Sequence, residues 1–226
     1  HTSAQHLRHK GTLGIECTEA SDSLLQTSKF PNTQGILVKS VVANSTAAVL
    51  GVQVDDIIVA INEMDSLDLL DFQKLERELK EQEPISITFV RGRHKTRVVG
   101  QTLARRMESS LGEVVYGEVG YGQGFLRTIV HKPFGAARFP TVFYLQDYTC
   151  SSVEFSKDSL SPIKKMVDGW VKAGYAVVRV EKPGIGESEG TKDCARLNYQ
   201  EELTAFQNAF AFFKKLPFID STQVFL

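Results

Sequence analysis

The sequence has little of several features that usually mark a class of protein. Its 226 residues include three cysteines and one tryptophan, and no apolar run approaches the roughly 18 residues that a membrane span needs. Lysine and arginine number 26 against 27 aspartates and glutamates, so the charge gives no reason to expect a nucleic acid or an anionic membrane as partner. No signal-peptide pattern opens the chain. These absences leave a globular protein of one large domain or two ordinary ones.

The three cysteines do not indicate a cross-linked scaffold. Cys17, Cys150 and Cys194 are far apart in the sequence and show no C-x-x-C spacing. We expect three inert, buried thiols. His6 and His9 lie three residues apart without a Cys, Asp or Glu at ligand spacing nearby. The sequence therefore predicts no metal site, and it contains no cofactor motif.

A change of pattern divides the chain near residues 101–110. This stretch loses the alternation of apolar and polar residues, gathers charge and ends in small polar residues, as linkers often do. We expect a domain over residues 1–100, a linker over 101–110 and an incomplete domain over 111–226.

Before residue 100 the sequence predicts short strands around two helices. Strands are expected over 13–18, 34–42 and 55–62, with a terminal hairpin over 85–99. The segment 44–51 has a capping Asn or Ser at its start and a glycine at its end, which indicates a short helix. Asp68 is expected to cap a second helix, in which Phe72, Leu75 and Leu79 recur on one face.

Two motifs in this first block resemble the PDZ domain family. Gly11-Thr-Leu-Gly-Ile15 is similar to the loop with which these domains bind the terminal carboxylate of a peptide. Leu50-Gly-Val-Gln-Val-Asp-Asp-Ile-Ile-Val-Ala-Ile-Asn62 is similar to their helix end, turn and central strand. The order of elements looks most like bacterial PDZ domains attached to proteases. The resemblance implies a PDZ-like β-sandwich or partial barrel with two helices, which binds peptide C-termini.

The resemblance also implies a groove beside the first strand. Gly14 lets the backbone approach a ligand closely, so that successive N–H groups converge on its carboxylate. The strand that follows offers an edge to which an extended peptide can add. The residues expected to contact the peptide are Lys10, Leu13, Gly14, Ile15, Phe72 and Leu79. The apolar ones also suit a plain hydrophobic core, Lys10 also suits a solvated surface position, and Arg8 is another source of positive charge.

After residue 110 strands and helices alternate. Strands are expected over 113–116, 125–130, 141–145, 175–180 and 222–226, and helices over 161–173 and 201–216. Such an alternation predicts right-handed crossovers and a mostly parallel sheet.

Part of this second block resembles α/β-hydrolases. The run from Gly174 to Gly190 is similar to their fourth strand and the loop after it, and 143–152 sits where the family has its oxyanion loop. The resemblance implies the N-terminal part of a serine hydrolase of esterase or peptidase type. Asp147 and Tyr148 are the candidates for oxyanion contacts, although Asp147 stands where many relatives have glycine. A purely structural turn is the alternative.

Gly186-Glu-Ser-Glu-Gly190 satisfies the G-x-S-x-G pattern of a nucleophile elbow. Its context argues against that role, because the motif trails its strand by a Pro-Gly loop and precedes a poor helix start. Glu187 and Glu189 would also place negative charge beside a developing oxyanion. Every histidine of the chain precedes Ser188, whereas the histidine follows the serine in that fold. We therefore interpret Ser188 as a structural residue of a glycine turn.

The sequence thus predicts an α/β and mixed fold, in which the PDZ-like domain is followed by a partial, mostly parallel α/β-hydrolase sheet. The predicted function is that of a bacterial PDZ-containing serine hydrolase, of which this chain is an N-terminal portion without the nucleophile elbow and without activity of its own. Its PDZ domain would bind the C-terminal peptide of a partner or substrate. A non-catalytic peptide-binding protein is the alternative. A periplasmic or secreted location rests on analogy alone.

Overall fold

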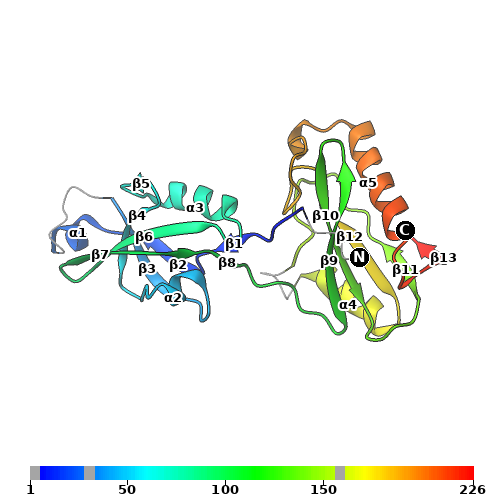
Figure 1. The fold of residues 1–226 in the computed structure, drawn as a ribbon, viewed down its shortest axis with the longest axis horizontal. Helices are drawn as coiled ribbons and strands as arrows, with labels where there is room; N and C mark the ends of the chain where they lie inside the picture. Colours follow the sequence, from blue (N-terminus) through cyan, green and yellow to red (C-terminus); the bar gives the residue numbers. More distant parts are fainter. Residues whose placement is uncertain (1–5, 28–33, 156–160) are drawn as a thin grey trace. The chain divides into compact units, whose positions relative to one another are not determined.

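The computed structural model describes residues 6–27, 34–155 and 161–226, and the chain divides into two compact units. The first unit is Arg8–Arg105, and the second unit consists of His1–Leu7 together with Arg106–Leu226 (Figure 1). Because residues 6 and 7 belong to the second unit, the first unit is an insertion within it. The domain boundaries expected from the sequence stay a prediction.

The first unit is built on an antiparallel sheet of six strands. Five strands follow one another in the order β2 (Ile15–Glu19), β3 (Ile36–Val41), β4 (Ile57–Ile61), β6 (Pro84–Arg91) and β7 (His94–Gln101), while β5 (Met64–Asp65) pairs with β4. Among the described strands β2 pairs with β3 alone, so its other edge is open. Strands β1 (Gly11–Thr12) and β8 (Leu103–Ala104) form a separate pair that joins the two ends of the unit.

Among its described residues, three helices accompany this sheet, where the sequence predicted two. The short helix α2 (Thr46–Val49) is capped by Ser45, whose Oγ accepts a hydrogen bond from Ala48 N. The longer helix α3 (Leu69–Glu78) is capped by Asp68 as expected, with Asp71 N donating to its carboxylate at 2.7 Å. The additional helix is α1 (Asp22–Thr27), whose six residues are too few for a helical periodicity to show.

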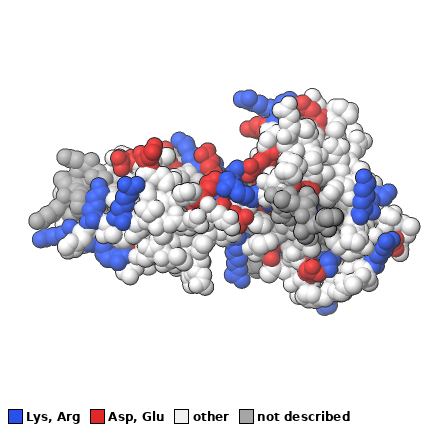
Figure 2. Space-filling model, in the orientation of Figure 1, with Lys and Arg blue, Asp and Glu red and all other residues white. Residues whose placement is uncertain are grey.

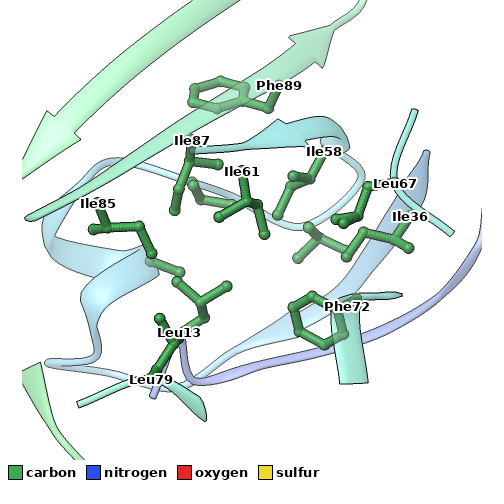
Figure 3. Packing of buried hydrophobic residues seen from close by; sticks show 13 residues of the cluster. Leu13, Ile36, Ile58, Ile61, Leu67, Phe72, Leu79, Ile85, Ile87 and Phe89 are labelled. Carbon is green, nitrogen blue, oxygen red and sulfur yellow. The ribbon is translucent and has the colours of Figure 1, made fainter. Parts of the chain in front are cut away.

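Hydrophobic residues are buried on both faces of this sheet. The main cluster includes Leu13, Ile36, Ile58, Ile61, Leu67, Phe72, Leu79, Ile85, Ile87 and Phe89 (Figure 3). A smaller cluster joins Leu25 of α1 to Ile57 and Val59 of β4. Neighbouring residues of β4 thus enter different clusters, because successive side chains of a strand point to opposite faces.

The second unit contains a five-stranded sheet of mixed direction. Its order is β13 (Ile219–Phe225), β11 (Phe139–Phe143), β12 (Ala176–Val180), β10 (Gly124–Lys132) and β9 (Glu113–Tyr121). Strand β11 is parallel to β12 and β13, whereas β10 is antiparallel to β9 and β12. The helices α4 (Pro162–Lys172) and α5 (Tyr199–Phe213) and the short 3₁₀ helix η1 (Cys194–Arg196) complete the unit.

The predicted fold class is wrong. The sheet of the second unit is not mostly parallel, since two of its four pairings are antiparallel, and the chain is richer in strand (36%) than in helix (23%). The physical reason lies in the tight turn between β9 and β10, where Gly122 has a φ of +60°. Such a turn reverses the chain and makes the two strands antiparallel. The structure therefore does not show the expected α/β-hydrolase sheet.

The expectation of three free thiols is also wrong. Cys150, in the loop after β11, forms a disulfide with Cys194 of η1, across a sequence separation of 44 residues. Cys17 on β2 is the free cysteine. Because the two bonded cysteines are distant in sequence, only the fold brings them together.

Charged side chains of both signs share the visible surface of each unit. Figure 2 shows lysines and arginines beside aspartates and glutamates rather than a face of a single sign. This distribution agrees with the near-zero net charge of the chain. Among the described residues no helix is long and apolar enough to cross a bilayer.

Candidate functional site

The turn between β1 and β2 has a conformation that requires glycine. Gly14 has a φ of +70°, and a Cβ atom added there would lie 2.3 Å from the Cβ of Ser45. Two carbonyl groups of this turn accept hydrogen bonds from the backbone of the same unit. Ala47 N donates to Leu13 O at 3.0 Å, and Val42 N donates to Gly14 O at 2.8 Å. The N-terminus of α2 and the end of β3 therefore fix the turn from one side.

The open edge of β2 lies next to helix α3, which contacts both β1 and β2. Ile15 and Cys17, two residues apart on β2, are half-buried and pack at the margin of the main hydrophobic cluster. Leu75 of α3 has the same half-buried position at that margin. An unpaired strand edge and a partly exposed apolar strip thus occur in the same part of the unit.

The structure brings the expected apolar site residues into one cluster, but at different depths. Leu13, Phe72 and Leu79 are almost fully buried, with exposed fractions of 0%, 6% and 6% (Figure 3). Ile15 lies at the margin of the cluster and retains more accessible surface. The first three are therefore core residues of the unit, whereas the side chain of Ile15 is partly accessible.

The two candidate cations at the start of the unit lie in different surroundings. Lys10 forms an antiparallel bridge with Lys80, which follows α3, and the next amide, Gly11 N, donates to Leu79 O. Arg8 forms an ion pair with Glu83 at 2.9 Å. The backbone therefore places Lys10 beside the C-terminal end of α3.

Three further residues around β2 and α3 were not singled out as site residues from the sequence. Cys17 and Leu75 flank the open edge, as described above. The third is Glu76 of α3, whose carboxylate accepts a hydrogen bond from Leu13 N at 3.1 Å. Glu76 follows Phe72 by four residues and so shares its helix face. An acidic residue inside an apolar helical stripe was the signal that could have found it.

The comparison with known families concerns this same region. Residues 37–91 match the family profile described as the PDZ domain. The first unit contains a PDZ domain. The match runs from β3 through β6 and contains the second of the two sequence motifs, from Leu50 to Asn62.

Several solved structures are similar to part of the chain. The HtrA-type protease AlgW with a decapeptide has 24% sequence identity and a TM-score of 0.38 over 43% of this chain and 30% of its own. The HtrA3 PDZ domain bound to a phage-derived ligand has 26% identity and a TM-score of 0.33 over 42% of this chain and 84% of its own. DcsB in complex with its substrate analogue has 16% identity and a TM-score of 0.38, covering 50% and 35% of the two chains. The chain thus spans about a third of the AlgW chain, and no curated protein sequence matches it.

These comparisons give no support to the α/β-hydrolase resemblance of the second unit. In the loop after β11 the Asp147 carboxylate accepts hydrogen bonds from Thr149 N at 3.0 Å and from Thr149 Oγ1 at 2.5 Å. These two bonds, the hydroxyl's foremost, lower the pKa of Asp147. Tyr148 is 91% exposed. The Asp147 side chain therefore closes a local turn of the Asx type.

Ser188 is a structural residue of the second unit, as its sequence context indicated. Its side chain is buried, its Oγ accepts a hydrogen bond from Arg127 N at 3.1 Å and donates to Glu181 O at 3.4 Å. The adjacent Glu187 is also buried and forms an ion pair with Arg127 at 2.7 Å. This serine joins the loop after β12 to strand β10.

The second unit buries three ionisable side chains that contact one another, Glu108, His131 of β10 and Arg179 of β12. Glu108 accepts hydrogen bonds from Arg179 at 2.7 and 3.1 Å, from His131 at 2.7 Å and from Phe155 N at 2.6 Å. Burial alone would raise the pKa of Glu108, but the bonds from His131 and Arg179 lower it to about 2. Burial lowers the pKa of His131 from its ordinary value of 6.5. The folded unit therefore favours an ionised Glu108 and a neutral His131.

This buried group predicts a loss of stability in acid. The unfolded chain binds protons at His131 below about pH 6.5 and at Glu108 below about pH 4.5, in both cases before the folded unit does. Between pH 7 and pH 5 we expect the free energy of unfolding of the second unit to fall as His131 takes up a proton in the unfolded chain, with a further fall as the pH drops from about 4.5 towards 2.

Urea titrations followed by the fluorescence of Trp170 measure this effect, because the tryptophan lies in α4 of the second unit and is the only one in the chain. A His131→Asn variant should lose the part of the dependence between pH 7 and pH 5. A wild-type profile that is flat over that interval would contradict the prediction.

Proposed function

We propose that the PDZ domain binds a peptide in extended conformation, added as a further strand to the open edge of β2 beside α3. The observation that carries this proposal is the terminal position of β2 in its sheet, which leaves backbone N–H and C=O groups available along one side. Such groups pair readily with an incoming strand. The edge follows directly after the glycine turn at Gly14, as strand addition at a PDZ domain would require.

The apolar strip formed by Ile15, Cys17 and Leu75 would contact the side chains of the peptide. These residues already pack against the core, so a peptide side chain placed on them would cover apolar surface without an ordering cost for the protein. The last residues of the peptide would lie towards the Gly14 turn, with Lys10 as the expected positive charge nearby. An apolar C-terminal side chain is therefore the preferred ligand feature.

Shortening Leu75 tests the groove. We expect Leu75→Ala to weaken the binding of an apolar-ended peptide about tenfold, because part of the apolar contact area on α3 is lost. The matched control is Leu70→Ala, on the same helix but 65% exposed, which should leave the affinity within twofold. The measurement is fluorescence anisotropy of labelled peptides with free C-termini, selected from a C-terminal library with the full 226-residue chain.

A second measurement does not depend on a substitution. Cys17 is the free cysteine of the chain, since the other two are joined. A peptide bound along β2 should therefore protect Cys17 from N-ethylmaleimide. The proposal fails if no library peptide binds, or if peptide binds while Leu75→Ala has no effect and Cys17 is labelled at an unchanged rate.

Gly14 is a poorer choice for this test than its place in the motif suggests. A Cβ atom at this position would collide with Ser45, and the φ of +70° is unfavourable for any other residue. A Gly14 variant would therefore disturb the packing of α2 as well as the turn. Loss of binding in such a variant would not separate the groove from the fold.

A further inference from the structure

Helix α3 carries a carboxylate on the face that otherwise packs into the core. Glu76 lies between Phe72 and Leu79 in the sequence and is half-buried. A carboxylate withdrawn from water needs hydrogen-bond donors in its new surroundings. The identity of these donors gives Glu76 a role beyond helix stability.

Both oxygen atoms of Glu76 are bonded to the turn before β2. Oε2 accepts from Leu13 N at 3.1 Å, and Oε1 accepts from Thr12 Oγ1 at 2.5 Å. The same Thr12 hydroxyl accepts from Gly14 N at 3.1 Å. One carboxylate thus engages two successive amides of the turn, the first directly and the second through a hydroxyl group.

These amides are the ones that a peptide carboxylate would use if the proposed function holds. The terminal carboxylate of a peptide has the same two oxygens and the same charge as the Glu76 side chain. Two carboxylates at one set of donors would repel each other and would leave one of them without partners. A peptide with a free C-terminus therefore has to displace Glu76 before it can bond to the turn.

We propose that Glu76 is an internal competitor for the terminal carboxylate of a bound peptide, and so determines how strongly this PDZ domain distinguishes a free C-terminus from other extended segments. This inference rests on the proposed function and concerns the same groove. With Glu76 bonded to Thr12 and Leu13, the groove still offers the β2 edge and the apolar strip. Only the contribution of the ligand's carboxylate is suppressed.

The surroundings of Cys17 agree with this position of the charge. Burial and the nearby negative charge of Glu76 raise the pKa of the Cys17 thiol to about 11. Cys17 is two residues beyond Ile15 on β2, along the strand edge that a peptide would follow. The negative charge of Glu76 therefore acts on Cys17, on the strand edge, as well as on the turn at Gly14.

The test compares one peptide in two forms, with a free C-terminal carboxylate and with a C-terminal amide. Binding is measured by anisotropy to the 226-residue wild type and to Glu76→Gln, Glu76→Ala and Glu78→Gln. We expect both Glu76 variants to bind the free acid about tenfold more tightly, which corresponds to the release of one charged hydrogen bond. The affinity for the amide should change less than twofold. Glu78→Gln, an exposed position on the same helix, should change neither affinity.

Two different failures can be told apart in this experiment. If the peptides bind but the Glu76 variants alter both forms equally, or weaken the free acid, Glu76 is not a competitor and peptide binding stands. If neither form binds to any protein, the proposed function falls and the role of Glu76 falls with it. Glu76→Gln keeps the shape of the side chain, so it remains informative if Glu76→Ala does not fold.

A second readout follows the amides themselves. In ¹⁵N-resolved NMR spectra, addition of the free-acid peptide to Glu76→Ala should shift the amide signals of Leu13 and Gly14 more than the amidated peptide does. In the wild type the two peptides should produce similar shifts at these positions. Equal shifts in the variant would overturn the proposal.

Discussion

Arg179→Met is expected to lower the free energy of unfolding of the second unit by about 3–5 kcal/mol, because it leaves Glu108 buried without its main cationic partner. Both residues are fully buried, and two nitrogen atoms of Arg179 donate to the two oxygens of Glu108. A carboxylate that has lost this bidentate partner must either remain ionised in an apolar environment or take up a proton. Either outcome destabilises the folded unit.

The size of the loss in stability distinguishes a buried arginine that pairs with a buried carboxylate from an exposed arginine. Urea unfolding followed by Trp170 fluorescence reports the second unit, and Arg106→Met, at an exposed position, should change its stability by less than about 0.5 kcal/mol. The double variant Glu108→Leu/Arg179→Met should recover much of the loss, because it removes the stranded charge as well. If Arg179→Met behaves like Arg106→Met, Glu108 does not depend on this partner.

Removal of the disulfide between Cys150 and Cys194 is the second large effect expected. The closed loop contains a sequence separation of 44 residues, for which the loop-entropy relation gives about 4 kcal/mol of stabilisation. The bond joins the loop after β11 to η1, two segments without regular strand pairing to hold them together. Reduction should therefore lower the unfolding midpoint of the second unit substantially.

The experiment compares unfolding with and without a phosphine reductant. Wild type should lose stability on reduction, whereas Cys150→Ser should be equally unstable in both buffers. Cys17→Ser should behave like wild type, since Cys17 is not part of the bond. Peptide affinity of the PDZ domain, which lies in the other unit, should not depend on reductant. An unchanged midpoint for reduced wild type would contradict the prediction.

Local signals in the sequence were sufficient for most elements of the first unit. The Asp68 cap and the spacing of Phe72, Leu75 and Leu79 predicted α3, because capping and a 3.6-residue period are both encoded within one turn or two of the helix. Gly14 was singled out because glycine lets the backbone approach a ligand closely, and the structure adds a second reason, its φ of +70°. Its collision partner, Ser45, lies 31 positions later and could not be read from the motif.

The errors arose where distant segments meet. The direction of pairing between β10 and β12 depends on the path of more than 40 residues between them. The alternating strands and helices suggested a mostly parallel sheet, whereas β10 is antiparallel to β12. The disulfide and the group formed by Glu108, His131 and Arg179 have the same origin. Each joins residues that are far apart in the sequence, and no local sequence pattern indicates that they lie close together in the fold.

Glu76 illustrates a different difficulty. Its neighbours in the sequence indicated a helix with an apolar face, and a charged residue in such a face is usually assigned to the solvated margin. Only the structure of the turn from Thr12 to Gly14 shows that hydrogen-bond donors lie beside Glu76. The sequence therefore predicted the helix, but it did not predict that Glu76 of this helix accepts hydrogen bonds from the turn.

The insertion of the PDZ domain within the second unit has a consequence for the order of folding. Leu7 O accepts a hydrogen bond from Arg127, 120 residues later, and His6 N donates to Glu118. In an unfolded chain these contacts close a very long loop. Once β1 has paired with β8, which sets Gly11 opposite Ala104, only a short path remains to be closed. The entropic cost of closing the loop then falls by roughly 1.5 kcal/mol. A folded PDZ domain therefore raises the effective concentration at which the rest of the second unit meets residues 6 and 7.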